Sequence, residues 1–215
     1  MEPCQLYLIT PPHIPDLPAF VAQLEAVLEA VPVAALQLRL KAEEGRGEAI
    51  AESSVAVHAA ETIFPVAKAR GTVCLVNDSA KVAREVGADG VHLGQGDGSV
   101  EAARELLGDD ALVGVTCHNS RDLAFQAAAD GADYVAFGAF FPTPTKAPKS
   151  AADLELLEWW HEAMTLPCVA IGGITPLNAK ALVEAGADFL AVSSGVWGAA
   201  SPERAARSLW ELCQR

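Results

Sequence analysis

The sequence places charged side chains directly after short apolar runs. Arg39 and Lys41 belong to one such group, and Asp78 and Asp97 follow two other runs. Arginine and lysine bind phosphate oxygens, and two carboxylates that lie close together suit Mg²⁺, which completes its shell with water and substrate oxygens. If the fold brings these side chains together, they predict a site for a ligand that carries a diphosphate.

The segment Gln37-Leu-Arg-Leu-Lys41 indicates which side chains of the first group share a face. In a strand, residues two apart point to the same side, so Gln37 and Arg39 lie on one face and Leu38 and Leu40 on the other. If the leucines pack outward against helices, Gln37 and Arg39 point inward and Lys41 lies at the rim. A buried charge of this kind needs an anionic partner.

A proline-rich loop, residues 137–146, follows another apolar run. Its two prolines fix φ and favour extended neighbours, so the loop is stiff. It presents two hydroxyls and one ammonium, on Thr143, Thr145 and Lys146, which suit an anionic ligand. Taken alone, the loop is more simply interpreted as a proline-rich surface turn with solvated side chains, so the rest of the chain must decide.

Glycine and serine follow two further runs, in the segments 171–174 (I-G-G-I) and 192–195 (V-S-S-G). Backbone N–H groups in such turns, next to a helix start, are a usual phosphate site at the end of a barrel. At the end of the expected strand 112–116, Thr116 can offer a hydroxyl to the same site. His118 belongs either behind the site or at the start of the next helix, and we favour the helix start.

A repeated tripeptide indicates the elements that position these residues. Gly87-Ala-Asp89, Gly131-Ala-Asp133 and Gly186-Ala-Asp188 each come between a helical pattern and a short apolar run. A glycine at this place suits the left-handed position that ends a helix. Strands so apolar are covered on both faces, as parallel strands are.

Along the whole chain, eight units of one short apolar strand and one helix can be counted. They predict a single-domain (β/α)₈ TIM barrel over residues 1–215. The expected strands are 5–10, 34–40, 73–76, 90–93, 112–116, 134–137, 168–171 and 189–192. The expected helices are 17–30, 48–69, 80–86, 100–107, 120–130, 154–164, 176–185 and 202–214, the second bent or broken near Pro65. The expected N-cap residues are Asp16, Ser79, Asn119 or Ser120, Thr175 and Ser201. A doubly wound sheet is the alternative, but the G-x-G-x-x-G loop of dinucleotide-binding proteins is missing after the first strand.

The composition limits the kinds of partner. The chain has 215 residues and a net charge of −13, which argues against nucleic acid or an anionic membrane surface. Its five cysteines form no C-x-x-C pair, so buried thiols in a reducing compartment are expected. No segment reaches the ~18 apolar residues of a membrane span, and we expect a cytoplasmic protein. The four tryptophans leave homo-oligomer formation open.

In this order the motifs Q-L-R-x-K, N-D, V-H-L-G-Q-x-D, P-T-x-T-K and I-G-G-I resemble the thiamine phosphate synthase family. The similarity runs from Leu6 to Ser193. The resemblance implies a TIM barrel that joins 4-amino-5-hydroxymethyl-2-methylpyrimidine diphosphate to 4-methyl-5-(2-phosphoethyl)thiazole. The products are thiamine phosphate and diphosphate. It also implies a dissociative displacement assisted by Mg²⁺, in which Arg39, Lys41 and Lys146 stabilise the leaving diphosphate.

The resemblance assigns roles residue by residue. The implied contacts to the pyrimidine diphosphate are Gln37, Arg39, Lys41, Asn77, Thr116 and Lys146. The implied contacts to the thiazole phosphate are Thr143, Thr145, Gly173, Val192 and Ser193, and the implied Mg²⁺ ligands are Asp78 and Asp97.

Three positions depart from the commonest pattern of the family. Leu40 stands where a glutamate is frequent, Ser79 where a second aspartate is frequent, and Gly96 where an acid is frequent. The related thiazole tautomerase shares the fold, the P-T loop and a histidine at position 118, but usually lacks the acid at Asp97. A homologue that binds thiamine phosphates without turnover is a third reading.

Overall fold

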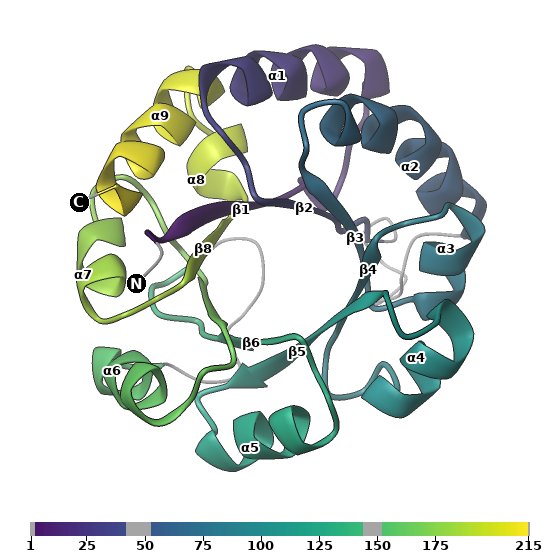
Figure 1. Ribbon diagram of the computed structural model, residues 1–215. Coiled ribbons are helices and arrows are strands. Elements are labelled where there is room, and N and C mark those ends of the chain that lie inside the picture. The colour runs from purple at the N-terminus through teal and green to yellow at the C-terminus, as the bar shows by residue number, and fades with distance from the viewer. Residues whose placement is uncertain (1–2, 42–52, 144–151, 215) are drawn as a thin grey trace.

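The computed structural model describes residues 3–41, 53–143 and 152–214. Eight parallel strands pair in chain order and close into a barrel, with helices on the outside (Figure 1). The strands are β1 (Gln5–Ile9), β2 (Ala35–Leu38), β3 (Val73–Asn77), β4 (Gly90–Leu93), β5 (Leu112–His118), β6 (Tyr134–Phe137), β7 (Cys168–Ile171) and β8 (Phe189–Val192). The predicted (β/α)₈ barrel is confirmed.

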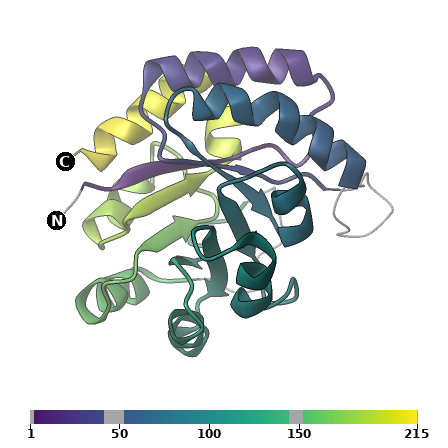
Figure 2. The same ribbon diagram turned by 45° about the vertical axis from the view of Figure 1, so that its right-hand side comes forward.

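The helices follow the expected pattern closely. They are α1 (Leu17–Ala30), α2 (Ser53–Lys68), α3 (Ala80–Glu85), α4 (Val100–Leu107), α5 (Arg121–Ala129), α6 (Leu154–Ala163), α7 (Ala179–Glu184), α8 (Ser194–Trp197) and α9 (Pro202–Cys213). Asp16, Ser79 and Ser120 cap α1, α3 and α5 by accepting a backbone N–H, as predicted. Figure 2 shows α1 lying between α2 and α9 on the outside of the barrel.

Three details of the helices differ from the sequence prediction. Helix α2 runs on through Pro65, so the expected break is wrong. Helix α7 begins at Ala179 and not at residue 176, because Thr175 starts a turn in which its carbonyl oxygen accepts the N–H groups of Asn178 and Ala179. The short helix α8 directly after β8 was not predicted, since its four residues are too few to show a helical period.

Two apolar layers hold the barrel together. Side chains that alternate along the strands point either outward, where residues such as Leu8 and Leu36 pack against the helices, or inward, where Leu75 and Val169 fill the interior. Outward burial of Leu38 and Leu40 confirms the predicted faces of β2. The barrel thus has a packed floor, and only the ends of its strands are left to form a cavity.

The repeated Gly-Ala-Asp tripeptide fastens neighbouring strands at the end of the barrel where the strands begin. Each of its glycines has a positive φ, between 60° and 95°, as expected at a helix end. Each aspartate then accepts the backbone N–H of the first residue, or the second, of the preceding strand, at 2.7 Å for Asp89, 2.6 Å for Asp133 and 2.8 Å for Asp188. The repeat is therefore a structural clamp and lies away from the strand ends that carry the polar groups.

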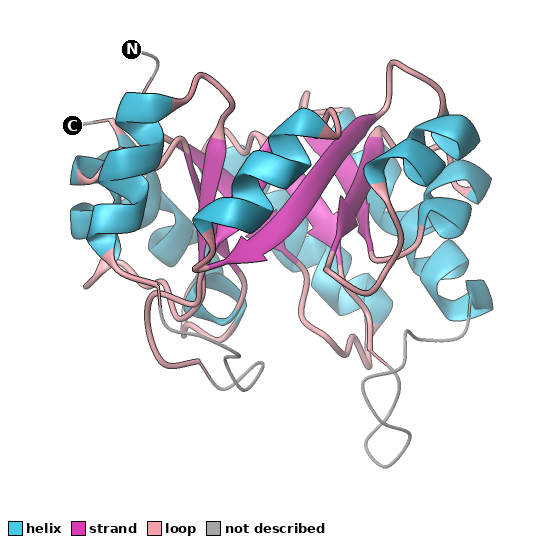
Figure 3. Cartoon of the chain, turned by 90° about the horizontal axis from the view of Figure 1, so that it is seen from below, coloured by secondary structure: helices cyan, strands magenta, loops and turns pink. Residues whose placement is uncertain are grey.

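Figure 3 shows the barrel from the side, with the strand arrowheads at the end opposite the two chain termini. Within residues 3–41, 53–143 and 152–214, no helix has both the length and the apolar character needed to cross a membrane. The five cysteines are free and buried, in agreement with the prediction of buried thiols.

Candidate active site

A cavity of about 340 Å³ opens where the strands end, and all eight strands or the loops directly after them contribute to its lining. Most of the predicted site residues meet there. They are Gln37, Arg39, Lys41, Asn77, Asp78, Asp97, Thr116, Thr143, Gly173 and Ser193. The spacing argument therefore located one continuous site from segments far apart in the sequence.

Three predicted residues do not lie in that lining. Thr145 and Lys146 fall outside the described residues. Val192 is buried in the outer core, with its side chain packed away from the cavity, so only its backbone could reach a ligand. Its neighbour Ser193 lines the cavity and donates its hydroxyl to the carbonyl oxygen of Thr10 at 3.2 Å.

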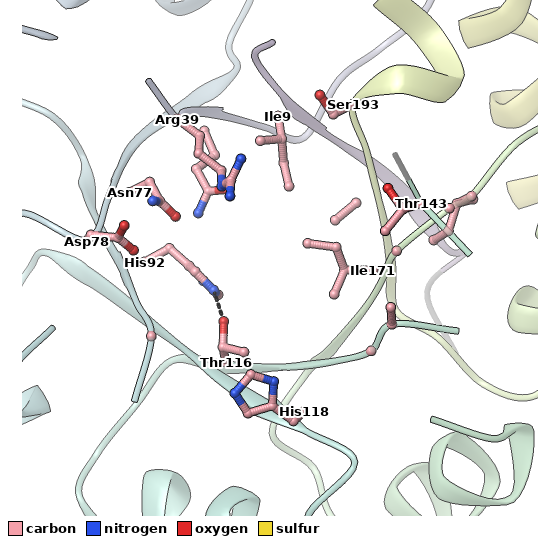
Figure 4. A pocket seen from close by; sticks show the side chains of 18 of the residues that line it. Ile9, Arg39, Asn77, Asp78, His92, Thr116, His118, Thr143, Ile171 and Ser193 are labelled. Atoms are coloured by element: carbon pink, nitrogen blue, oxygen red, sulfur yellow. Dashed lines mark hydrogen bonds between the residues drawn. The ribbon is translucent and has the colours of Figure 1, made fainter. Parts of the chain in front are cut away.

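One side of the cavity carries the charged groups (Figure 4). Lys41 Nζ lies 3.5 Å from Asp78 Oδ2, and Asp97 accepts the backbone N–H of Gly94 at 2.9 Å. Burial, and then the negative charge of Asp97, raises the pKa of Asp78, while Lys41 and Arg39 partly offset the rise. A buried carboxylate whose proton affinity is raised in this way, with a second carboxylate beside it, is stabilised when a cation replaces the proton.

This carboxylate pair fits Mg²⁺ better than a metal that needs a full protein shell. No group of three or more histidine, cysteine, aspartate or glutamate residues suited to a metal occurs in the described part of the chain. Mg²⁺ keeps several waters and is usually held by one or two carboxylates together with substrate phosphates. Asp78 and Asp97 supply that number.

Gln37 shows that the cavity is prepared for a polar ligand. Its side chain is only 2 % exposed and lines the cavity, yet its Nε2 has no hydrogen-bond partner among the described residues. A buried amide donor without an acceptor costs about 1–3 kcal/mol. A ligand that brings an acceptor to this place recovers that free energy.

The opposite side of the cavity is built from backbone turns. Figure 4 shows Thr143, Ile171 and Ser193 across the cavity from Arg39 and Asp78. The loop after β6 runs alongside the turn after β7, and the Phe141 N–H donates to the carbonyl oxygen of Gly172 at 3.1 Å. These turns, together with the start of α8, face the cavity with small residues and backbone groups.

Gly173 is required by this packing. Its φ is 62°, and a Cβ at this position would lie 2.4 Å from the carbonyl oxygen of Pro142. Only glycine avoids both the conformational strain and the clash. The Gly-Gly pair of the sequence thus allows the proline loop and the turn after β7 to lie in direct contact.

Two histidines also line the cavity. His92 was not singled out in the sequence, although its inward direction follows from the alternation with the outward Val91 and Leu93. His118, which was expected behind the site or at a helix start, lines the cavity as well, and Ser120 caps the next helix. The register of β5 with β6 shifts between Thr116 and His118, and His118 has a positive φ of 55°, so simple alternation along β5 does not place its side chain.

His92 is neutral in the folded protein. Burial lowers its pKa to about 4, with the charge of Asp97 acting in the opposite direction and that of Arg39 in the same direction. Its Nε2 lies 2.8 Å from the hydroxyl oxygen of Thr116. His92 can therefore orient a neighbouring hydroxyl but does not supply a positive charge to an anion at neutral pH.

A family model described as thiamine monophosphate synthase matches residues 6–196 of the chain. The chain belongs to this family. It is 54 % identical over 211 residues to the thiamine-phosphate synthase of Hyphomonas neptunium, covering 96 % of this chain and 94 % of that protein. It is also 54 % identical over 197 residues to the thiamine-phosphate synthase of Rhodospirillum centenum, covering 92 % and 91 %.

Solved structures agree with this membership. Thiamine phosphate pyrophosphorylase from Pyrococcus furiosus superposes with a TM-score of 0.83 at 30 % identity, covering 98 % of this chain and 95 % of that chain. Orotidine 5′-phosphate decarboxylase from Pyrococcus horikoshii superposes with a TM-score of 0.68 at 13 % identity, covering 97 % and 99 %, which is a likeness of fold alone.

Proposed function

We propose that this chain acts as a thiamine-phosphate synthase, which joins a pyrimidine diphosphate to a thiazole phosphate and releases diphosphate. The observation that carries the proposal is the division of one cavity into two different sides. Cations and paired carboxylates lie on one side, and glycine and serine turns lie on the other. Two substrates that each carry phosphate account for both.

The charged side suits a diphosphate leaving group. Arg39 and Lys41 line it, and Asp78 and Asp97 would hold Mg²⁺. The ion, when bound, would neutralise part of the diphosphate charge. Arg39 and Lys41 would then stabilise the charge that develops as the carbon–oxygen bond breaks, and Lys146, from outside the described residues, would add a third cation. Gln37, Asn77 and Thr116 would orient the same substrate.

The backbone turns on the opposite side suit the thiazole phosphate. Thr143, Gly173 and Ser193 line this side, and Thr145 and the backbone of Val192 would complete the contacts. The thiazole nitrogen has its own lone pair, so no protein base is needed to activate it. Holding this nitrogen against the carbon that loses diphosphate is the main task of the site, and such positioning supplies several kcal/mol of the barrier reduction.

The direct test is to mix the protein with both substrates and Mg²⁺ and to measure thiamine phosphate and diphosphate. We expect both products in equal amounts. Isomerisation of the thiazole phosphate without any condensation would overturn the proposal and favour the tautomerase. Binding of both substrates with neither reaction would favour a non-catalytic homologue.

The metal assignment has its own test in Asp97→Asn. Losing one of two carboxylate ligands should lower turnover by roughly 100-fold, as expected when one charge-stabilising group is removed, while the affinity for thiazole phosphate stays nearly unchanged. Asp110→Asn, an exposed carboxylate after α4, is the matched control. Equal turnover in Asp97→Asn and wild type would contradict the assignment.

We also propose that residues 1–215 form one domain, because the barrel and its helices account for all three described segments. The cytoplasmic location and the open question of self-association stay predictions from the sequence.

A further inference from the structure

A chain of hydrogen bonds runs through the interior of the barrel up to the cavity. Tyr7 Oη lies 2.9 Å from Tyr134 Oη, Tyr134 Oη lies 3.0 Å from His92 Nδ1, and His92 Nε2 lies 2.8 Å from Thr116 Oγ1. The four side chains come from β1, β6, β4 and β5. Figure 4 shows the last of these bonds at the floor of the cavity.

The far end of this chain is closed. Tyr7 is 3 % exposed and lies in an inner cluster of apolar side chains that includes Leu75, Val169 and Ala191. Among the described residues, the Tyr7 hydroxyl has the Tyr134 hydroxyl as its one hydrogen-bond partner. A proton on Tyr7 that does not point at Tyr134 is therefore a buried donor without an acceptor, which is costly.

The middle of the chain is held by packing. Tyr134 stacks on His92 with ring centroids 5.6 Å apart and an interplanar angle of 24°. Gly114 on β5 makes room for the phenol, because a Cβ there would lie 1.9 Å from Cζ of Tyr134. The aromatic rings thus have one arrangement, and only the positions of the protons remain to be determined.

Counting donors determines those positions. If Tyr7 donates to Tyr134, the Tyr134 proton is free to donate to His92 Nδ1, so the imidazole carries its proton on Nε2 and donates it to Thr116. Every buried donor is then paired, and the Thr116 proton points into the cavity. If the chain ran the other way, Thr116 would donate to His92, His92 Nδ1–H to Tyr134, and Tyr134 to Tyr7. The Tyr7 proton would then have no acceptor. An imidazolium would add a further donor and would strand one phenolic proton too.

We propose that His92 is a positioning residue, fixed by Tyr134 as the Nε2–H tautomer, which makes Thr116 an obligatory hydrogen-bond donor to the substrate. Thr116 would then recognise an atom with a free lone pair, such as a ring nitrogen or a phosphate oxygen, and would disfavour an amino group at the same place. The identity of the substrate as the pyrimidine diphosphate rests on the function proposed above. The tautomer does not, because it follows from the ligand-free protein.

The tautomer is measured directly from the ¹⁵N chemical shifts of His92 in the ligand-free protein by NMR. We expect a protonated Nε2 and an unprotonated Nδ1. Tyr134→Phe removes the group that donates to Nδ1, so Nδ1 lacks a partner in either tautomer. The preference for the Nε2–H tautomer should weaken, and its fraction should fall below that of the wild-type protein. Tyr7→Phe keeps the Tyr134 donor, so in this matched variant the Nε2–H tautomer should persist. A protonated Nδ1 in the wild-type protein would overturn the proposal, whether or not either variant folds.

A kinetic measurement then tests the effect on the substrate. In Tyr134→Phe, we expect the KM for the pyrimidine diphosphate to rise roughly tenfold, the effect of one weakened hydrogen bond, with the KM for thiazole phosphate unchanged. A merely structural role would raise both constants or neither, and either result would overturn the link to the substrate. Absence of turnover in wild-type protein that still shows the Nε2–H tautomer would refute the proposed function and leave the tautomer assignment standing.

Discussion

The buried His92 should make the stability of the folded protein depend on pH in a defined window. Burial lowers the pKa of His92 from its ordinary value of 6.5 to about 4. Between these values the unfolded chain binds a proton that the native protein does not bind. Stability is therefore fully present above pH 6.5, falls as the pH falls, and stops changing below about pH 4.

The magnitude follows from the size of the pKa shift. Each unit corresponds to about 1.4 kcal/mol, so the whole shift is worth about 3 kcal/mol. The linkage relation gives a loss of about 2 kcal/mol in the free energy of unfolding between pH 7 and pH 5, so most of the effect falls in a range that is easy to measure. That range ends just above the isoelectric point of about 4.7, where solubility is lowest.

The assay is urea unfolding of wild type and His92→Gln at pH 7, 6 and 5, in a chelator so that no divalent cation binds near Asp97. The many carboxylates titrate in both proteins, so the difference between the two free energies of unfolding isolates His92. The variant should be less stable at pH 7, and the difference should narrow by about 2 kcal/mol at pH 5. His58→Gln, at an exposed site on α2, serves as the control. A difference that stays constant over this range would refute the reasoning.

Two further predictions concern the clamp and the glycine turn. Asp133→Asn removes the charge that accepts from β5 at 2.6 Å and from an arginine at 2.9 Å, and should lower the free energy of unfolding by about 1–3 kcal/mol in urea denaturation. The exposed Asp130→Asn should change it by under about 0.5 kcal/mol. Gly173→Ala introduces strain at a φ of 62° and a clash with Pro142, so calorimetry should find roughly tenfold weaker binding of thiazole phosphate. Unchanged binding would contradict its place in that subsite.

The strands and the site were largely predictable because both follow from local rules. Short runs such as 134–137 and 189–192 are apolar and each begins directly after a Gly-Ala-Asp tripeptide, so their type and limits are clear in the sequence. Once eight strands are paired in order, every residue that follows a strand must face the same end of the barrel. Gln37, Asp78 and Thr116 were therefore found without knowledge of any distance.

The remainder depends on contacts between distant segments. The inward direction of His92 was available from the sequence, but its partners on β5 and β6 were not. The four residues of α8 are too few for a period, and the continuation of α2 past Pro65 depends on packing against the barrel. Hydrogen bonds such as that of Tyr7 with Tyr134 join residues 127 positions apart and cannot be read from spacing.

The structure also explains one departure from the usual pattern of the family. Ser79 stands where a second aspartate is frequent, and its side chain accepts the backbone N–H of Val82 at 3.2 Å as the cap of α3. Serine and aspartate serve this purpose about equally well. The substitution therefore keeps the helix start, and the two acids at the cavity remain Asp78 and Asp97.

The Gly-Ala-Asp clamps affect the order in which the strands of the barrel pair during folding. Each clamp joins residues only 15 or 20 positions apart, whereas the hydrogen bond from Ser193 to Thr10 joins β8 to β1 across 183 positions. Closing the longer loop costs about 2 kcal/mol more in chain entropy. We expect the three clamped strand pairs to form early and the seam between first and last strands to form late. Because the lining draws on Ile9 and Ser193 from the two sides of that seam, regain of ligand binding during refolding should report completion of the ring.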